Sequence, residues 1–146
     1  MVDKQNAYLK TQILTARPEQ LTLMLFDGAI RFGEKARKCL DEEDYEASFE
    51  SLSRAEQIVM ELLNSLRPEN SPDICRQQAG LYLFVYSKLV EANMSHQTAA
   101  LDDALRVLGV LRETWAMLMA KQQENPGEMT SPPTQDESSS AVSIEG

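Results

Sequence analysis

Residues Pro18 to Leu40 read PEQLTLMLFDGAIRFGEKARKCL, and this segment decides the fold. A proline suits the first position of a helix, because its missing N–H would have no partner there. Apolar side chains then recur every three or four residues, which is the spacing of one face of an α-helix. The segment is therefore predicted to be one long helix of a packed bundle. Its core stripe is expected to consist of Leu21, Met24, Leu25, Gly28, Ala29, Phe32, Ala36, Cys39 and Leu40.

Three further segments repeat this spacing and complete the pattern. Prolines and polar residues separate them, and every connection is short. Short connections place consecutive helices side by side in opposite directions. The fold class is therefore predicted to be all-α, an antiparallel up-down four-helix bundle. Its helices are expected over about residues 18–40, 45–66, 72–94 and 99–123.

The last 23 residues have a different composition from the rest of the chain. They contain three prolines, five acidic residues and no lysine or arginine. Such a segment cannot bury enough apolar surface to offset the entropy lost on ordering. The predicted organisation is an N-terminal capping segment (1–17), the four-helix bundle (18–123) and a disordered acidic tail (124–146).

The charge of the chain excludes several classes of function. Fourteen basic and 23 acidic residues give a net charge of −9 and an isoelectric point near 4.6. Nucleic-acid binding needs a basic surface, and an anionic membrane would repel such a chain. No apolar run approaches the roughly 20 residues of a membrane helix. The first residues do not resemble a secretory signal. We therefore expect a cytoplasmic (cytosolic) protein that neither binds nucleic acid nor inserts into a membrane.

Side chains that carry chemistry are sparse. The single histidine, His96, and the two cysteines, Cys39 and Cys75, lie too far apart to give the close ligand pairs of zinc sites. No Gly-x-Ser-x-Gly elbow and no glycine-rich phosphate loop occur. We expect His96 to lie in a solvated loop. The sequence predicts no enzyme, no metal site and no cofactor.

The informative feature is a surplus of apolar residues. A bundle helix needs about three apolar positions in seven, and several of the predicted helices exceed this. The segment 81–86 is apolar or aromatic on every side, and the N-terminal segment 8–14 carries large apolar groups with no predicted helix of its own. Gly28 adds to the picture, because a glycine inside a helix costs about 1 kcal/mol relative to alanine. We expect another helix backbone or a ligand to approach closely there.

Three explanations of the surplus remain open from the residues alone. Large apolar patches usually mark a surface for a partner, and a groove of this kind suits an amphipathic helix. A homodimer, or the N-terminal segment folded back, would also bury the extra residues. Isolated apolar side chains are also common on ordinary protein surfaces.

Four stretches, in order along the chain, resemble one known family. Tyr8 is followed by TQILTARPEQL at 11–21 and by MLFDGAIR at 24–31. Further motifs fall within 55–62, 81–93 and 111–115. Together they resemble the flagellar secretion chaperones for flagellin, the FliS family. Arg17 stands where this family usually has serine, and Phe26 where it usually has tyrosine.

The resemblance implies a cytoplasmic four-helix-bundle chaperone. Such a protein binds the disordered C-terminal region of flagellin, prevents its premature polymerisation and keeps it competent for flagellar type III secretion. Loaded with flagellin, it delivers the subunit to the flagellar export apparatus. The bound segment becomes partly helical, and the N-terminal tyrosine segment can occlude the surface that it binds. The competing prediction is a homodimeric regulatory or structural bundle without a secretion client.

The resemblance and the surplus stripes together select the candidate binding residues. A movable N-terminal cap is expected from Tyr8, Ile13 and Leu14. The apolar surface that faces the partner is expected to consist of Leu23, Phe26, Ile30, Tyr82, Tyr86 and Met94. Polar anchors are expected at Asp27, Arg31 and Asn93, whereas Leu81 and Trp115 are expected in the core.

Overall fold

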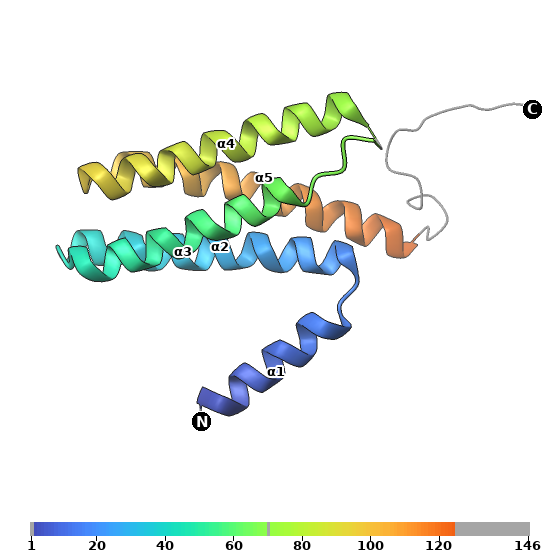
Figure 1. The fold of residues 1–146 in the computed structure, drawn as a ribbon, viewed down its shortest axis with the longest axis horizontal. Helices are drawn as coiled ribbons and strands as arrows, with labels where there is room; N and C mark the ends of the chain where they lie inside the picture. Colours follow the sequence, from blue (N-terminus) through green and yellow to red (C-terminus); the bar gives the residue numbers. More distant parts are fainter. Residues whose placement is uncertain (1, 70, 125–146) are drawn as a thin grey trace, which may run out of the picture.

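A computed structural model describes residues 2–69 and 71–124, apart from the side chains of 2–5 and 12–14. All regular structure in these residues is helical (Figure 1). The helices are α1 (Val2–Thr15), α2 (Pro18–Asp41), α3 (Tyr45–Asn64), α4 (Pro72–Ser95) and α5 (Thr98–Glu124).

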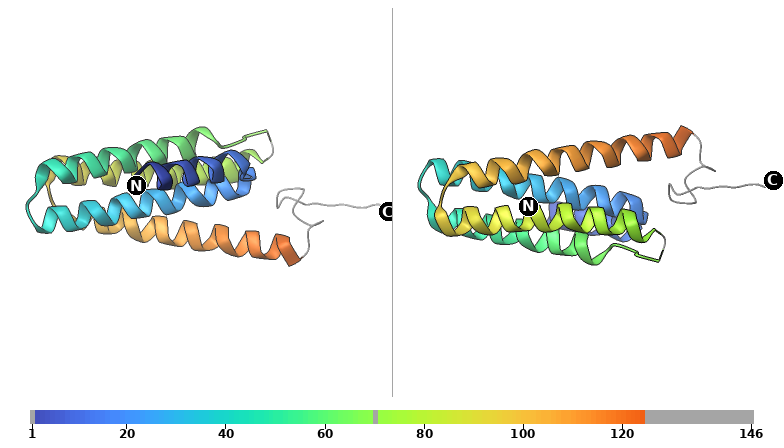
Figure 2. Two further views of the ribbon diagram at one scale, coloured as in Figure 1. Left: turned by 90° about the horizontal axis from the view of Figure 1, so that it is seen from below. Right: turned by 90° about the horizontal axis from the view of Figure 1, so that it is seen from above.

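Helices α2 to α5 form the predicted antiparallel four-helix bundle. Each packs on the next in the chain, and α5 closes the ring against α2 (Figures 1 and 2). The observed ends lie within two residues of the predicted ones. Glu124, which we assigned to the tail, ends α5 instead. The remaining tail, 125–146, lies outside the described residues, so its disorder stays a prediction.

The N-terminal segment differs from our expectation, because it forms a helix of its own, α1. Most of its residues favour helix, although they do not form a clear apolar face. Arg17 is extended, with φ −74° and ψ 160°, as a residue before proline prefers to be. Pro18 therefore separates α1 from α2, and α1 projects from the bundle at an angle (Figure 1).

Side chains and a left-handed residue fix the ends of the bundle helices. The Arg17 N–H donates to Gln20 Oε1 at 3.0 Å, at the position where the family's serine is missing. The Asp44 carboxylate accepts from the Ala47 N–H at 3.2 Å at the start of α3. His96 ends α4 with φ 60° and is exposed, and its ring stacks on Tyr45 with the centroids 4.1 Å apart.

The core stripe of α2 differs from the predicted one. Phe26 is only 2% exposed, whereas Leu21 and Met24 are half-buried. A Cβ at Gly33 would lie 2.7 Å from Leu105 Cδ2, so α5 approaches this side of α2 very closely. Five predicted core residues of α2 are buried as expected, and the full buried set is Phe26, Gly28, Ala29, Gly33, Ala36, Cys39 and Leu40.

The other core predictions have mixed outcomes. Trp115 packs against the core as predicted, and its indole Nε1–H donates to the Glu19 carbonyl oxygen at 2.8 Å. Leu81 is 42% exposed, so its predicted core position is wrong. A Cβ at Gly28 would lie 3.2 Å from Ile58 Cδ1, so the close neighbour at this glycine is a side chain of α3 and not the helix backbone or ligand that we expected.

Candidate functional site

A groove of about 590 Å³ lies between α1, α2 and α3. Figure 2 shows α1 beneath the seam between α2 and α3, and Figure 1 shows α1 diverging from that seam toward its own N-terminal end. The apolar side chains that line the groove come from all three helices. They are Leu9 of α1, Leu21, Met24 and Leu25 of α2, and Ile58 of α3.

The spacing of residues along α2 explains why the groove forms. Leu21, Met24, Leu25 and Gly28 occupy positions i, i+3, i+4 and i+7, which lie on one face of a helix. Gly28 has no side chain, and therefore leaves the groove open above the contact between α2 and Ile58. The residues that we predicted as core thus form the floor of a surface groove.

Charged residues surround the apolar floor. Asp27, Arg31 and Glu61 complete the lining of the groove. Asp27 accepts a hydrogen bond from Arg112 Nε of α5 at 2.8 Å. This bond and the charge of Asp27 raise the pKa of Arg112 above its ordinary value. The pair therefore ties Asp27 to α5, while Arg31 remains exposed at the groove.

Helix α1 covers the groove only in part. Leu9 lines the groove, yet this side chain is 47% exposed, and Tyr8 is 69% exposed. A helix that buried its apolar residues fully against the bundle would leave much less of them in water. The side chains of the other two predicted cap residues, Ile13 and Leu14, lie outside the described residues. Tyr8 and Leu9 therefore cover the groove only in part, and the predicted role of α1 as a movable cap stays a proposal.

Two predicted partner-facing residues belong to the core instead. Phe26 and Tyr82 are 2% and 4% exposed, and their ring centroids lie 6.2 Å apart. The prediction that they form an exposed contact surface is therefore wrong. Burial raises the pKa of the Tyr82 hydroxyl to about 12, with a smaller contribution from Cys75. The misassignment arose because residues 21–26 are nearly all apolar, so that spacing alone supports two stripes.

The remaining apolar predictions are scattered over the bundle. Leu23, Ile30 and Tyr86 are half-buried, and the last two pack against the core. Met94 is 79% exposed near the C-terminal end of α4. None of these four residues lines the groove among the residues described.

The polar predictions divide between two places. Asp27 and Arg31 lie at the groove, as described above. Asn93 lies between α4 and α3, where its Nδ2 donates to Glu56 Oε2 at 3.4 Å. Its buried Oδ1 has no hydrogen-bond partner among the described residues. Burial raises the pKa of Glu56, and the Asn93 hydrogen bond partly opposes this.

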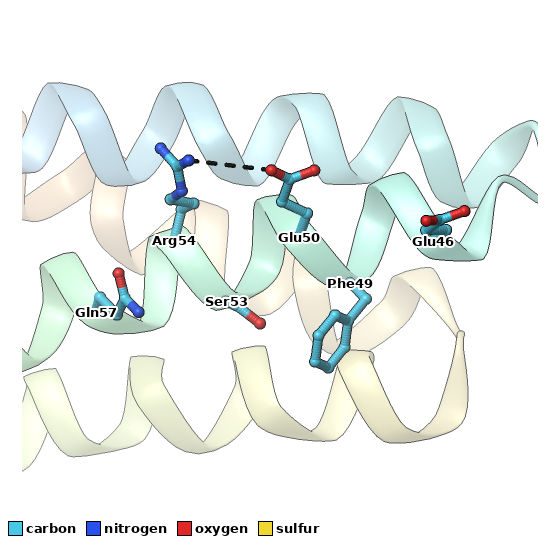
Figure 3. A pocket seen from close by; sticks show the side chains of 6 residues that line it. All are labelled: Glu46, Phe49, Glu50, Ser53, Arg54 and Gln57. Carbon is cyan, nitrogen blue, oxygen red and sulfur yellow. Dashed lines mark ion pairs between the residues drawn. The ribbon is translucent and has the colours of Figure 1, made fainter.

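A smaller hollow, of about 320 Å³, lies on α3 and faces outward (Figure 3). Phe49 points toward α4, while Arg54 and Glu50 point toward α2. The Arg54 and Glu50 side chains approach to 4.0 Å. The hollow is polar apart from Phe49, and it has no nucleophile–base pair among its lining residues.

The described part of the chain offers neither a metal site nor a membrane-spanning helix. Residues 2–69 and 71–124 contain no group of three or more histidine, cysteine, aspartate or glutamate residues that could hold a metal ion. Within the same residues, no helix is long and apolar enough to cross a membrane. The apolar groove is the strongest candidate for the functional site.

Fold and groove together define an antiparallel helical bundle with an apolar groove on its surface. The family model described as "Flagellar protein FliS" matches residues 1–123. The chain therefore belongs to the FliS family, as the resemblance predicted. This membership gives the chain the role of an export chaperone of the flagellum, and it makes the protein a non-enzyme.

Individual relatives agree with this membership. The "Flagellar secretion chaperone FliS" of Salmonella typhimurium is 30% identical over 114 residues, which cover 77% of this chain and 84% of the relative. The protein of the same name from Bacillus subtilis is 27% identical over 119 residues, covering 82% and 88%. A crystal structure of a bacterial flagellar chaperone matches with a TM-score of 0.67, covering 81% of this chain and 98% of that one. At 20% identity, this last likeness shows the fold alone.

Proposed function

We propose that this chaperone binds the C-terminal region of flagellin in the groove between α1, α2 and α3. In the cytosol, the bound chaperone would prevent premature polymerisation and keep flagellin competent for type III secretion through the flagellar export apparatus. The observation that carries the proposal is an apolar groove, open to solvent, between α1 and the bundle. Such a groove suits the apolar face of an amphipathic helix.

The partial cover of the groove supports a mechanism in which a client helix replaces α1 in the groove. Leu9 occupies one wall of the groove while remaining half in water. A client helix that packs on Leu21, Met24 and Ile58 would compete with α1 for the same apolar surface. Because the described apolar side chains Tyr8 and Leu9 remain substantially in water, little of their burial is lost when they leave the groove. We infer that Tyr8 and Leu9 move away from the groove when a client binds.

The experiment is a calorimetric titration of the full chain with the C-terminal segment of flagellin. We expect binding with a negative heat-capacity change, since apolar surface is buried. Met24→Glu should weaken the binding about tenfold or more, because it places a charge on the apolar floor. Met117→Glu is the matched control, because Met117 is exposed on α5 and lies outside the groove lining. Equal effects of the two variants would contradict the groove as the binding site.

A homodimer is the second candidate, and one observation favours it. Lys88 and Asp103 approach to 3.8 Å and set the antiparallel register of α4 and α5. That register places exposed Leu81 opposite exposed Val110, and exposed Ile74 opposite exposed Met117. Burial of this apolar strip by a second copy would stabilise a dimer. Light scattering that gives the monomer mass at high concentration would exclude it.

A further inference from the structure

The groove changes from apolar to basic along α2. Its floor is apolar from Leu21 to Gly28, and Arg31 marks the end of the apolar part. Beyond it, Lys35 and Lys38 follow Arg31 at i+4 and i+7, so all three lie on one face of α2. These three basic residues form no ion pair among the side chains described. An unpaired basic face is notable in a chain with a net charge of −9.

Arg54 of α3 lines the neighbouring hollow rather than the groove, but it shares an aromatic contact with Arg31. The guanidinium centres of Arg31 and Arg54 lie 5.4 and 5.7 Å from the centroid of one ring, that of Phe32. Two arginines from neighbouring helices therefore converge on one aromatic side chain. Stacking on the ring holds a guanidinium in place while its N–H donors stay available for hydrogen bonds.

Nearby acidic residues neutralise this cluster only in part. Glu50 approaches Arg54 to 4.0 Å, as Figure 3 shows, but both side chains are exposed and the contact is weak. Glu34 of α2 and Glu61 of α3 are also acidic and exposed, whereas Asp27, one turn before Arg31, is already paired with Arg112. Positive charge therefore remains in excess at the end of the groove.

The direction of α1 bears on which polarity of bound helix the basic end favours. α1 leads into Pro18 at its C-terminal end and runs roughly antiparallel to α2 while diverging from it, so its N-terminal end lies on the side toward which α2 runs (Figure 1). The N-terminus of a helix carries a partial positive charge and the C-terminus a partial negative charge. α1 therefore has the unfavourable polarity in this groove. A bound helix of the opposite polarity would place its negative end at Arg31 and Arg54.

We propose that Arg31 and Arg54 form a carboxylate receptor for a helix that ends at this point with a free chain terminus. The inference rests on the proposed function, and it adds the polarity and the chemical end of the bound segment. The groove from Leu21 to Arg31 is about 15 Å long, which accommodates about ten helical residues. The guanidinium fork matches the two oxygens of a carboxylate, so it distinguishes a chain end from a segment that continues.

The test compares two forms of one peptide from the C-terminus of flagellin, one with a free terminal carboxylate and one with a terminal amide. We expect the full-length chaperone to bind the carboxylate form about tenfold more tightly, because charge-assisted hydrogen bonds are lost on amidation. In the double variant Arg31→Gln/Arg54→Gln, the two peptides should bind equally. The matched control is Arg76→Gln/Arg106→Gln, which removes two exposed arginines on α4 and α5. This control should keep the tenfold preference.

Each other outcome has a defined meaning. If the native chain binds both peptides equally, the carboxylate receptor is refuted while the proposed chaperone function stands. If the control variant also loses the preference for the carboxylate peptide, the preference arises from the overall charge of the protein. The assignment to Arg31 and Arg54 is then wrong. If neither peptide binds the native chain at tens of micromolar, the proposed function fails, and this inference fails with it.

Discussion

The burial of the Tyr82 hydroxyl should make the free energy of unfolding depend on pH in the alkaline range. Its hydroxyl has a pKa of about 12 in the folded chain, against an ordinary value of 10.0, because burial disfavours the charged phenolate. The folded chain therefore holds this proton more tightly than the unfolded chain does. The contribution of Tyr82 to the free energy of unfolding is complete below pH 10 and is lost between pH 10 and pH 12.

The size of the loss follows from the two pKa values. One pKa unit corresponds to about 1.4 kcal/mol, so the loss is about 1.4 kcal/mol at pH 11. Above both pKa values it would approach about 2.7 kcal/mol. Since small domains are stable by only about 5–15 kcal/mol, a change of this size is readily measured.

The assay is urea unfolding at pH 8 and pH 11, followed by circular dichroism. The quantity of interest is the difference between the wild type and Tyr82→Phe, because it isolates the contribution of this one hydroxyl. The variant should lose about 1.4 kcal/mol less than the wild type between the two pH values. Tyr86→Phe, one turn further along α4, is the control and should keep the wild-type dependence. An identical loss in the wild type and in Tyr82→Phe would refute the burial of the Tyr82 hydroxyl.

Three further predictions test the cover, the core and the rim of the groove. Deletion of residues 1–15 should tighten client binding and leave the bundle helical by circular dichroism; a general loss of helicity would instead make α1 part of the core. Leu108→Ala should lower the free energy of unfolding in urea by about 2–5 kcal/mol, because Leu108 is fully buried, whereas Met117→Ala should change it by less than about 0.5 kcal/mol. Asp27→Asn removes the exposed ion pair with Arg112 and should cost no more than about 1 kcal/mol in the same assay, so a much larger cost would show that the pair is essential to the bundle.

The sequence was sufficient to predict the number of bundle helices, their direction and their ends. Pro18 and Pro72 each begin a helix, as a residue without a backbone N–H prefers to do. These signals are local, and they act within one or two turns of the chain.

The site depended on contacts that no local pattern contains. Between Leu21 and Phe26 nearly every side chain is apolar, so periodicity could not select the buried face. The buried face of α2 is instead determined by packing against α5, where Leu105 approaches Gly33 closely. These two residues are far apart in the sequence. The sequence reasoning therefore missed Leu9, Leu21, Met24, Leu25 and Ile58 as groove residues. The ion pair of Asp27 with Arg112 joins residues 85 positions apart and is equally invisible to spacing.

The hydrogen bond from Trp115 to the Glu19 carbonyl gives the molecule its own optical reporter. Trp115 is the single tryptophan of the chain, and Glu19 lies in the first turn of α2, next to the break that separates α1 from the bundle. The intrinsic fluorescence therefore originates at the junction that α1 would use to move. A spectral shift on adding client would follow that movement without any attached dye, and selective excitation of tryptophan would keep the four tyrosines silent.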